Sequence, residues 1–510
     1  MRAFVSISTV VLILAATPSL AQKSKDTLRL AINDPFPVLS GYCQPVDEAG
    51  NFYRRVYGTL VSFDERNHKA VPHLAKSWTR VNQTTLEFEL FDNISFHNGN
   101  KFDADDVVST VQYTSDPKHV FPNKPRFTWI KSVEKLGPYK VRIESETPNV
   151  IDLSQLAYRH QMQDKEAFDT LENKCDYGRL TPYGTGPYKV VSIDKNTGIV
   201  VERVEGFKGD PKHFRAPIKR IHGVPLPDRQ TQIAQLMTGN VDILRNVAPD
   251  NADELVKQMP SLVKTILPTG SFIPIVFDMA GRSGHKALMD QRVRRAMWMA
   301  LDRDTLIKGV VPGGKEGVAE KMSKICFDHN IGCDGSNNMP PYDPAEAKRL
   351  LAEAGYANGL DVVYDVFQPI RYIGEAIAGE WLKVGIRARV NSIPINVFRQ
   401  RETAGEINVS SVWVPTSALP DMAGILSTFF EGRDYARDAE MNELVAQGRL
   451  EFDEAKRKAI YRKLTDLNNE RAYVMAFSSL PTNYVHTTDI TIKPNLLSAG
   501  DNFIDDYFWR

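Results

Sequence analysis

The stretch FDNISFHNGNKFDADDVVST, residues 91–110, joins an alternating apolar run to a segment of helical character. The run at 85–91 predicts a strand, and Gly99 in the polar turn after it supplies a backbone angle that other residues avoid. Asp103 then has the position of a helix N-cap, and Asp106 three residues later completes a capping box. The stretch therefore predicts a strand, a tight turn and a capped helix.

Two ligand-binding interpretations of these residues fail on spacing. An EF-hand loop counted from Asp92 would put the apolar Ile94 and Phe96 where oxygen ligands are needed, and no Glu closes the loop. A phosphate-binding loop would need a Gly-Lys-Ser/Thr sequence, which the stretch lacks. We therefore expect neither a metal nor a phosphate here.

Strand-like and helix-like periods alternate to the end of the chain, without an internal repeat or a low-complexity tract. This alternation predicts α/β domains. The predicted strands include 26–32, 85–91, 140–145 and 198–204. The predicted helical segments include 230–239, 293–310, 343–356 and 375–386.

The first 21 residues have the pattern of a cleavable signal peptide. Arg2 precedes an apolar run from about Phe4 to Ala16, and the small-residue exit ends at Ala21. The run is short for a membrane span, although a signal anchor is the alternative. The first cysteine is Cys43, far from the cleavage point, so we expect a mature protein outside the cytoplasm without a lipid anchor.

Four cysteines in an exported chain are expected to pair. Cys326 and Cys333 have a spacing that suits a small closed loop, which would leave Cys43 to pair with Cys175 across a long one. The alternative is a Cys/His metal site that includes His329, but the CxxC spacing typical of thiolate sites is absent.

The charge balance and the motifs argue against several functions. Lys and Arg together number 63, as do Asp and Glu, so nothing suggests nucleic acid as a partner. The chain has no GxSxG and no HExxH motif, and its ten histidines are scattered singly. We expect no enzyme activity, no metal and no cofactor.

Segments along most of the chain resemble the extracytoplasmic solute-binding proteins of ABC importers, family 5, which includes dipeptide- and oligopeptide-binding proteins. The opening stretch is similar to the signature region of that family, which also has counterparts of other segments in the same order. These are HLAKSW (73–78), GTGPYKVV (184–191), VERVEGFKGDPK (201–212), GNVDIL (239–244), MDQRVRRAMWMALDRDTLIKGV (289–310) and EWLKVGIRARV (380–390).

The resemblance implies an α/β, two-lobed periplasmic binding protein fold of type II, in the large cluster C-like form. The implied parts are a signal peptide (1–21), a first lobe (22–62, 184–272 and 480–510), an extra peripheral subdomain on that lobe (63–183) and a second lobe (273–479). Apolar strands at 272–279 and 472–477 are expected to cross between the lobes, which would then close around a hinge.

The family's ligand motif matches only in part. Trp413 corresponds to an aromatic residue that packs on the ligand, and Asp421 corresponds to the trailing part of the motif. Two extra residues intervene, and Ala418 takes the place of the Asp that pairs with a peptide's α-amino group. Without that carboxylate an amine would be poorly held, unless Asp421 takes over the role.

Three further residues are weaker ligand candidates. Arg371 could bind a ligand carboxylate or could be a solvated surface residue. Tyr42 and Gln44 lie where the resemblance places a cleft-lining loop, although the neighbouring Cys43 could hold them back. Trp298 and Trp381 lie on apolar helix faces and are expected in the core.

The resemblance implies a periplasmic, monomeric substrate-binding component. It would capture a short peptide or peptide-like compound and deliver it to a permease and ATPase complex in the inner membrane. The alternative ligands are an oligosaccharide, an opine-type conjugate or a metal chelate, and the remote alternatives are an extracytoplasmic enzyme or a chaperone.

Overall fold

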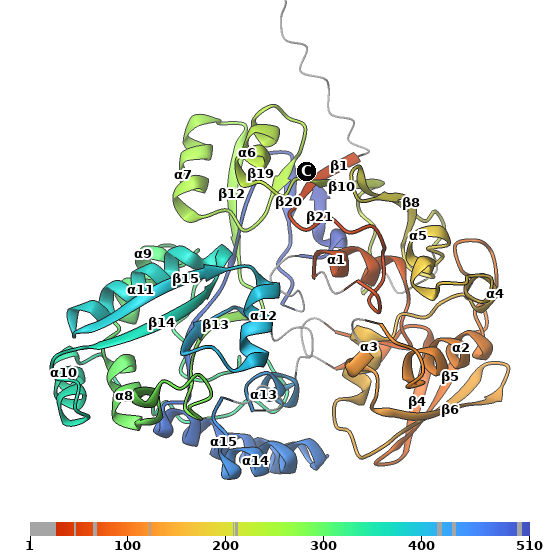
Figure 1. Ribbon diagram of the computed structural model, residues 1–510. Helices are drawn as coiled ribbons and strands as arrows, with labels where there is room; N and C mark the ends of the chain where they lie inside the picture. Colours follow the sequence, from red (N-terminus) through yellow and green to blue (C-terminus); the bar gives the residue numbers. More distant parts are fainter. Residues whose placement is uncertain are drawn as a thin grey trace, which may run out of the picture.

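Figure 1 shows a computed structural model of the protein as three neighbouring bodies. A seven-stranded sheet, a six-stranded sheet and a four-stranded sheet form their centres. We call these bodies the first lobe, the second lobe and the peripheral subdomain. The structure describes residues 27–44, 47–64, 69–121, 124–207, 209, 213–415, 421–430, 435–496 and 502–510.

The sheet of the first lobe is mixed. Its strand order is β12 (Leu262–Leu267), β19 (Thr482–Thr487), β11 (Ile243–Leu244), β1 (Thr27–Ile32), β10 (Arg220–Pro225), β9 (Gly198–Arg203) and β8 (Tyr188–Asp194). Strand β1 runs parallel to β10 and β11 on either side of it. The buried Asp242 accepts hydrogen bonds from Arg29 N (2.8 Å), Nε (3.1 Å) and Nη2 (2.9 Å), which gives GNVDIL a structural role beside β1.

The sheet of the second lobe has the order β15 (Ile386–Ile393), β14 (Leu360–Phe367), β16 (Val409–Ser411), β13 (Ser271–Phe277) and β17 (Val414–Pro415), with β18 (Val474–Ser479) also paired to β13. Trp298 and Trp381 are buried in its core, as predicted, and Trp381 Nε1 donates to Met297 O at 2.9 Å. The helical segment predicted at 293–310 is two helices, because Asp302 caps the second one through Thr305 N.

The opening stretch folds as predicted in the peripheral subdomain. The sheet order is β4 (Ala75–Asn82), β5 (Thr85–Leu90), β7 (Lys140–Ser145) and β6 (Ile130–Gly137). After β5, Gly99 has a φ of 97°, and α2 (Ala104–Ser115) begins at an Asp103 N-cap. Asp105 N donates to Asp103 Oδ1 at 2.7 Å, and Asp103 N donates to Asp106 Oδ2 at 2.9 Å, so the capping box is present.

The helices pack around the three sheets (Figure 1). They are α1 (Asp47–Val56), α3 (Asp152–Arg159), α4 (Lys165–Asp169), α5 (Tyr177–Leu180), α6 (Arg229–Met237), α7 (Pro249–Gln258), α8 (Gln291–Met299), α9 (Arg303–Val310), α10 (Pro344–Glu353), α11 (Arg371–Lys383), α12 (Ile395–Ala404), α13 (Met422–Phe430), α14 (Ala439–Leu450) and α15 (Glu454–Arg471). Two further ladders join β2 (Val61–Phe63) to β3 (Ala70–Pro72) and β20 (Ile490–Ile492) to β21 (Tyr507–Trp509).

Two stretches of chain pass between the sheets of the two lobes. β12 leads into β13, and β18 leads into β19. The crossing strands pair with each other in both sheets, β12 with β19 and β13 with β18. Where they cross, Thr269 Oγ1 donates to Leu480 O at 2.7 Å and Leu480 N donates to Ser271 O at 2.9 Å. The strands expected to cross are thus present as β13 and β18, while the predicted limits of the lobes stay a prediction.

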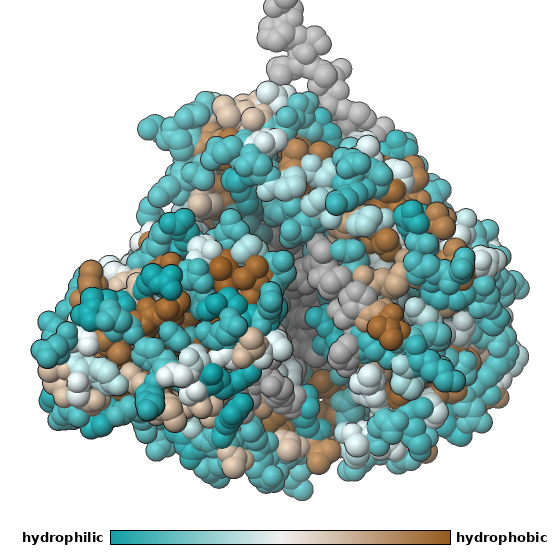
Figure 2. Space-filling view, viewed as in Figure 1, coloured by the Kyte–Doolittle hydropathy of each residue, from teal (hydrophilic) through white to brown (hydrophobic). Residues whose placement is uncertain are grey.

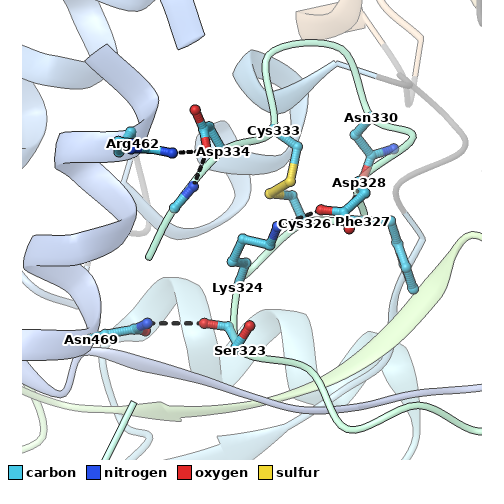
Figure 3. Close-up of a disulfide and its surroundings, with 11 residues drawn as sticks. Ser323, Lys324, Cys326, Phe327, Asp328, Asn330, Cys333, Asp334, Arg462 and Asn469 are labelled. Carbon is cyan, nitrogen blue, oxygen red and sulfur yellow. Dashed lines mark hydrogen bonds and ion pairs between the residues drawn. A yellow bond between two sulfur atoms is a disulfide. The ribbon is translucent and has the colours of Figure 1, made fainter. Parts of the chain in front are cut away.

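The four cysteines pair as predicted, Cys43 with Cys175 and Cys326 with Cys333. Both thiols of the close pair are therefore unavailable to a metal. Figure 3 shows the loop that the second bond closes, which we call the disulfide loop (326–333). Beside it, Asn469 Nδ2 donates to Ser323 O at 2.9 Å and Arg462 pairs with Asp334 at 3.1 Å, so α15 holds the loop from both sides.

Two of the family-like segments dock on each other. His97 Nδ1 accepts from Gly184 N at 3.2 Å, and His97 Nε2 donates to Gly186 O at 3.0 Å. A Cβ on Gly184 would lie 1.8 Å from Val56 O, and one on Gly186 would lie 2.4 Å from Arg55 O. Only glycine lets this backbone approach the end of α1 so closely. The GTG segment therefore joins the peripheral subdomain to α1 of the first lobe.

The contacts of His97 need a neutral imidazole, because a proton on Nδ1 would face the Gly184 N–H. Burial lowers the pKa of His97 from its usual 6.5 to about 4. Since the unfolded chain binds the proton more tightly, this group's contribution to stability is present in full above pH 6.5 and is lost progressively as the pH falls from 6.5 to 4.

We predict that His97→Asn flattens the pH dependence of unfolding. Between pH 6 and pH 4.5 the free energy of unfolding of the wild type should fall more steeply than that of the variant, by about 1.2 kcal/mol per pH unit. Urea unfolding at several pH values measures this. Equal slopes for the two proteins would contradict the assignment of a neutral, buried His97.

Candidate functional site

The disulfide loop is a place where the second lobe contacts the other two bodies. Ile331 packs against Phe63, Tyr158 and Phe503, which form a small apolar cluster. The loop is also tied to the start of α13, since Met422 N donates to Ile331 O at 2.9 Å. One face of the molecule is hollowed between the second lobe and the other two bodies (Figure 2). We take this meeting place of the lobes as the candidate ligand site.

Two further contacts cross from the peripheral subdomain to the second lobe. The Arg80 guanidinium lies over the Phe452 ring, 4.9 Å from its centroid. Ile151 is 5% exposed and belongs to the hydrophobic core cluster of the second lobe. The second lobe therefore also contacts the peripheral subdomain.

Asp421 stands at the start of α13 and is 2% exposed. Its Oδ1 accepts from Ala423 N at 2.9 Å, and its Oδ2 lies 3.2 Å from Arg457 Nη2. Burial raises the pKa of the Asp421 carboxyl to about 6, while Arg457 acts in the opposite direction. This carboxylate is thus engaged within the second lobe. To bind a ligand amine, as the sequence suggests, it would have to give up part of its contact with Arg457.

Trp413 lies between β16 and β17 and is half-buried against the core of the second lobe. Its ring meets the Phe367 ring edge-on, with 4.7 Å between centroids. Ala418 lies outside the described residues. The ligand-binding roles of Trp413 and Ala418 stay predictions.

The weaker candidates do not gather at one place. The Arg371 side chain is 63% exposed and pairs with Glu375 one turn further along α11, as the surface alternative predicts. Tyr42 is 2% exposed, its hydroxyl donates to Gln161 O, and its ring packs on Phe121 and Phe127. Exposure of Tyr42 to a ligand cleft is therefore wrong. Gln44 is half-buried, and its role stays a prediction.

A cavity of about 40 Å³ is lined by residues of both the first lobe and the peripheral subdomain, behind the cluster that Ile331 contacts. Sequence reasoning missed it, although α1 carried a signal. Arg55 stands three residues after Phe52 and one before Val56, on the buried face of the helix. A cation at such a position indicates a charge held inside the lobe. The cavity is lined by Arg54, Arg55, Tyr57, Thr59, Ser62, Phe63, His73, Ala157, Tyr158, Gln161, His213, Phe214 and Phe503.

The described residues also hold one group of carboxylates close enough to share a metal ion, Asp106, Asp164 and Glu166. Asp164 Oδ2 accepts from the side-chain amides of Asn98 (2.6 Å) and Asn100 (2.9 Å). Asp106 accepts two backbone N–H groups. These bonds explain the two buried carboxylates, Asp106 and Asp164, as parts of the scaffold, so we assign no metal to the group.

Comparisons with known proteins place these features in a family. The profile of the bacterial extracellular solute-binding proteins, family 5 (middle), matches residues 69–436. Heme-binding protein A of Haemophilus influenzae is 26% identical over 407 residues, 72% of this chain and 70% of that protein. Di/tripeptide-binding protein 1 of Pseudomonas aeruginosa is 25% identical over 455 residues, 82% of each chain.

A solved structure has the same fold. NikA from Brucella suis, in complex with Fe(III)-EDTA, superposes with a TM-score of 0.80 at 20% identity, over 95% of this chain and all of that one. The fold is therefore the two-lobed α/β fold that the sequence predicts. Within the described ranges, none of the helices has the length and apolar character needed to cross a lipid bilayer.

Asp421 has two possible roles, as the charge partner of Arg457 and as the anchor of a ligand amine, and its contacts lead to a test of them. We predict that Asp421→Ala lowers the free energy of unfolding by about 3 kcal/mol, because the buried Arg457 guanidinium loses its charge partner. Glu375→Ala removes the exposed partner of Arg371 and should cost no more than about 0.5 kcal/mol. Denaturant titrations at pH 7 measure both. An Asp421→Ala protein of wild-type stability that no longer binds peptides would instead support the amine-binding role.

Proposed function

Because this chain belongs to the bacterial extracellular solute-binding proteins of family 5, we propose that it captures a small solute between its two lobes and delivers it to a membrane permease. The observation that carries the proposal is the family match over residues 69–436, which includes most of the strands of both lobes and one of the two crossings. Proteins of this family are solute carriers for ABC importers, whose ATPase drives uptake, and are not enzymes.

The two crossings support a capture mechanism. Strands that pair with each other in both lobes limit the relative motion of the lobes to a bend near Thr269 and Leu480. A solute that contacts both lobes binds the closed form more tightly than the open form and shifts the population toward it. The permease can then recognise the closed form as the one that holds a solute.

The proposed solute is a short peptide or a peptide-like compound. The relatives bind different things by name, from di- and tripeptides to heme, and their modest identity does not select among these. Asp421 already faces Arg457, so nothing in the described residues supplies a ready carboxylate for a ligand ammonium at that position. We therefore favour a solute whose recognition does not need a free α-amino group. A metal chelate, an oligosaccharide or an opine-type conjugate is the alternative.

Export and assembly complete the proposal. Residues 1–21 would direct the chain to the periplasm and be removed, without a lipid anchor. The mature protein would act as a monomer that docks on the permease and ATPase complex. The proposal includes no turnover of the solute.

Native mass spectrometry of the protein purified from its own host tests the function. We predict one bound solute per chain, lost on denaturation and unchanged in mass after prolonged incubation with fresh protein. Trp413→Ala should retain the fold and lose most of the solute, whereas Trp381→Phe changes only the core. Empty protein from every growth condition, together with no binding of di- and tripeptides, chelates or oligosaccharides, would overturn the proposal.

A further inference from the structure

The parallel strands of the first lobe end at the edge of their sheet that faces the second lobe. β11 and β12 both run antiparallel to β19, and β1 and β10 run parallel to β11, so these four strands end where β19 begins. In the second lobe, β14, β15 and β16 end where β13 begins. Both edges adjoin the crossings, so the carboxyl ends of the parallel strands in each lobe point toward the other lobe. Open α/β sheets bind their ligands outside such carboxyl ends.

The first-lobe sheet has its topological switch point between β1 and β11. After β1 the chain next enters this sheet at β8, on the far side of β10, whereas after β11 it next enters at β12, on the opposite side. Ligands of open α/β sheets lie between the two loops that diverge at such a point. Here these loops begin with Asn33–Asp34 after β1 and with Arg245–Asn246 after β11. β1 is the central strand of the seven, so the two loops lie at the middle of the edge.

A buried ion pair fixes the start of both loops. Arg245 is 3% exposed, and its Nη2 donates to Glu48 Oε1 at 2.6 Å and to Ala31 O at 3.2 Å. The other oxygen of that carboxylate, Glu48 Oε2, accepts from Asp34 N at 2.8 Å. The backbone of Asp34 is thereby held in place by the scaffold, while its side chain takes no part in these bonds.

The carboxylate of Asp34 has no partner in the described ranges of the chain. Asp34 is exposed, and no donor or cation in those ranges contacts its side chain. Burial nevertheless raises the pKa of this carboxyl from 3.8, and no neighbouring cation lowers it again. A carboxylate that is both accessible and partly desolvated lies in a recess of the surface. Because this recess is at the edge that faces the second lobe, a solute held between the lobes can reach Asp34.

The unpaired carboxylate determines which chemical group fits. A carboxylate that water solvates incompletely loses less solvation when it forms a charge-assisted hydrogen bond. Arg245 is not available as its partner, since Glu48 already engages it. An ammonium or a guanidinium of the solute would supply the missing charge. Asp421 of the second lobe differs in this respect, because Arg457 Nη2 lies 3.2 Å from its carboxylate.

We propose that Asp34 is the residue of the first lobe that binds a basic group of the transported solute, an ammonium or a guanidinium. This rests on the proposed function, and it adds that the solute is a basic peptide-like compound whose positive charge is held in the first lobe and not at Asp421. A side-chain cation serves as well as an α-amino group, so the solute can be blocked at its N-terminus.

The Cγ resonance of Asp34 in the full mature chain reports on this contact directly. We expect Nα-acetyl-L-arginine to shift this resonance saturably, and Nα-acetyl-L-lysine to do the same through its ammonium. Nα-acetyl-L-citrulline has the shape of the arginine derivative but a neutral urea in place of the guanidinium, so it should leave the resonance unchanged. Added salt should weaken the response to both cations, because the contact is accessible to solvent. The wild-type titrations need no variant to fold.

Two variants separate this carboxylate from the general surface charge. Asp34→Asn keeps the size of the side chain and the backbone bond to Glu48, and should weaken binding of Nα-acetyl-L-arginine by about tenfold or more. The backbone amide resonance of Asn33 follows binding in this variant. Glu205→Gln is the matched control, because this exposed acid follows β9, which runs antiparallel to β10 and so ends at the opposite edge of the sheet. It should change the affinity by less than about twofold.

Three outcomes would overturn the assignment of Asp34. They are an Asp34 resonance that Nα-acetyl-L-arginine does not move at tens of millimolar, an equal shift with Nα-acetyl-L-citrulline, and a solute in native mass spectrometry that carries no basic group. If one of them occurs while a bound solute is found, the solute-binding function stands and only the role of Asp34 falls. If Asp34 binds the two cations while no solute is ever found, the cation site stands without the transport role.

Discussion

The chain passes between its two main sheets twice, and the two crossings are paired strands on both sides of the gap. This pairing of strands limits how the two lobes can move relative to each other. Three of the crossing strands, β13, β18 and β19, are buried along nearly their whole length, which opposes fraying into a loose linker. We infer that the lobes are left with a bend at the Thr269–Leu480 contact. The disulfide loop, fixed to α15, places Ile331 against the cluster of Phe63, Tyr158 and Phe503.

Much of the fold was predictable from local chemistry. The capping box at Asp103 and the turn at Gly99 needed only short-range rules, and they appear as expected. The cysteine pairing followed from an even count and one short spacing. The local sequence does not explain why the GTG segment has glycines. They are needed because the end of α1, more than a hundred residues earlier, lies so close that any Cβ would strike a backbone oxygen.

The site was less predictable, because it depends on which side chains tertiary packing brings together. Tyr42 is in a loop where exposure was expected, but Phe121 and Phe127 surround it. As a carboxylate, Asp421 is suited to anchor an amine, and only the fold shows that Arg457 faces it. Conversely, Arg54, His73 and Gln161, which line the cavity, are unremarkable in sequence and come from three separate segments.

Small-angle X-ray scattering of the mature protein, with and without the solute identified by native mass spectrometry, tests the central claim that capture closes the lobes about the paired crossings. We predict a smaller radius of gyration with solute than without it. Replacing Ile331 by Asp should reduce that difference, because a charge would enter the contact with Phe63, Tyr158 and Phe503. An identical radius in the free and bound states, for a solute that binds at one per chain, would contradict the account.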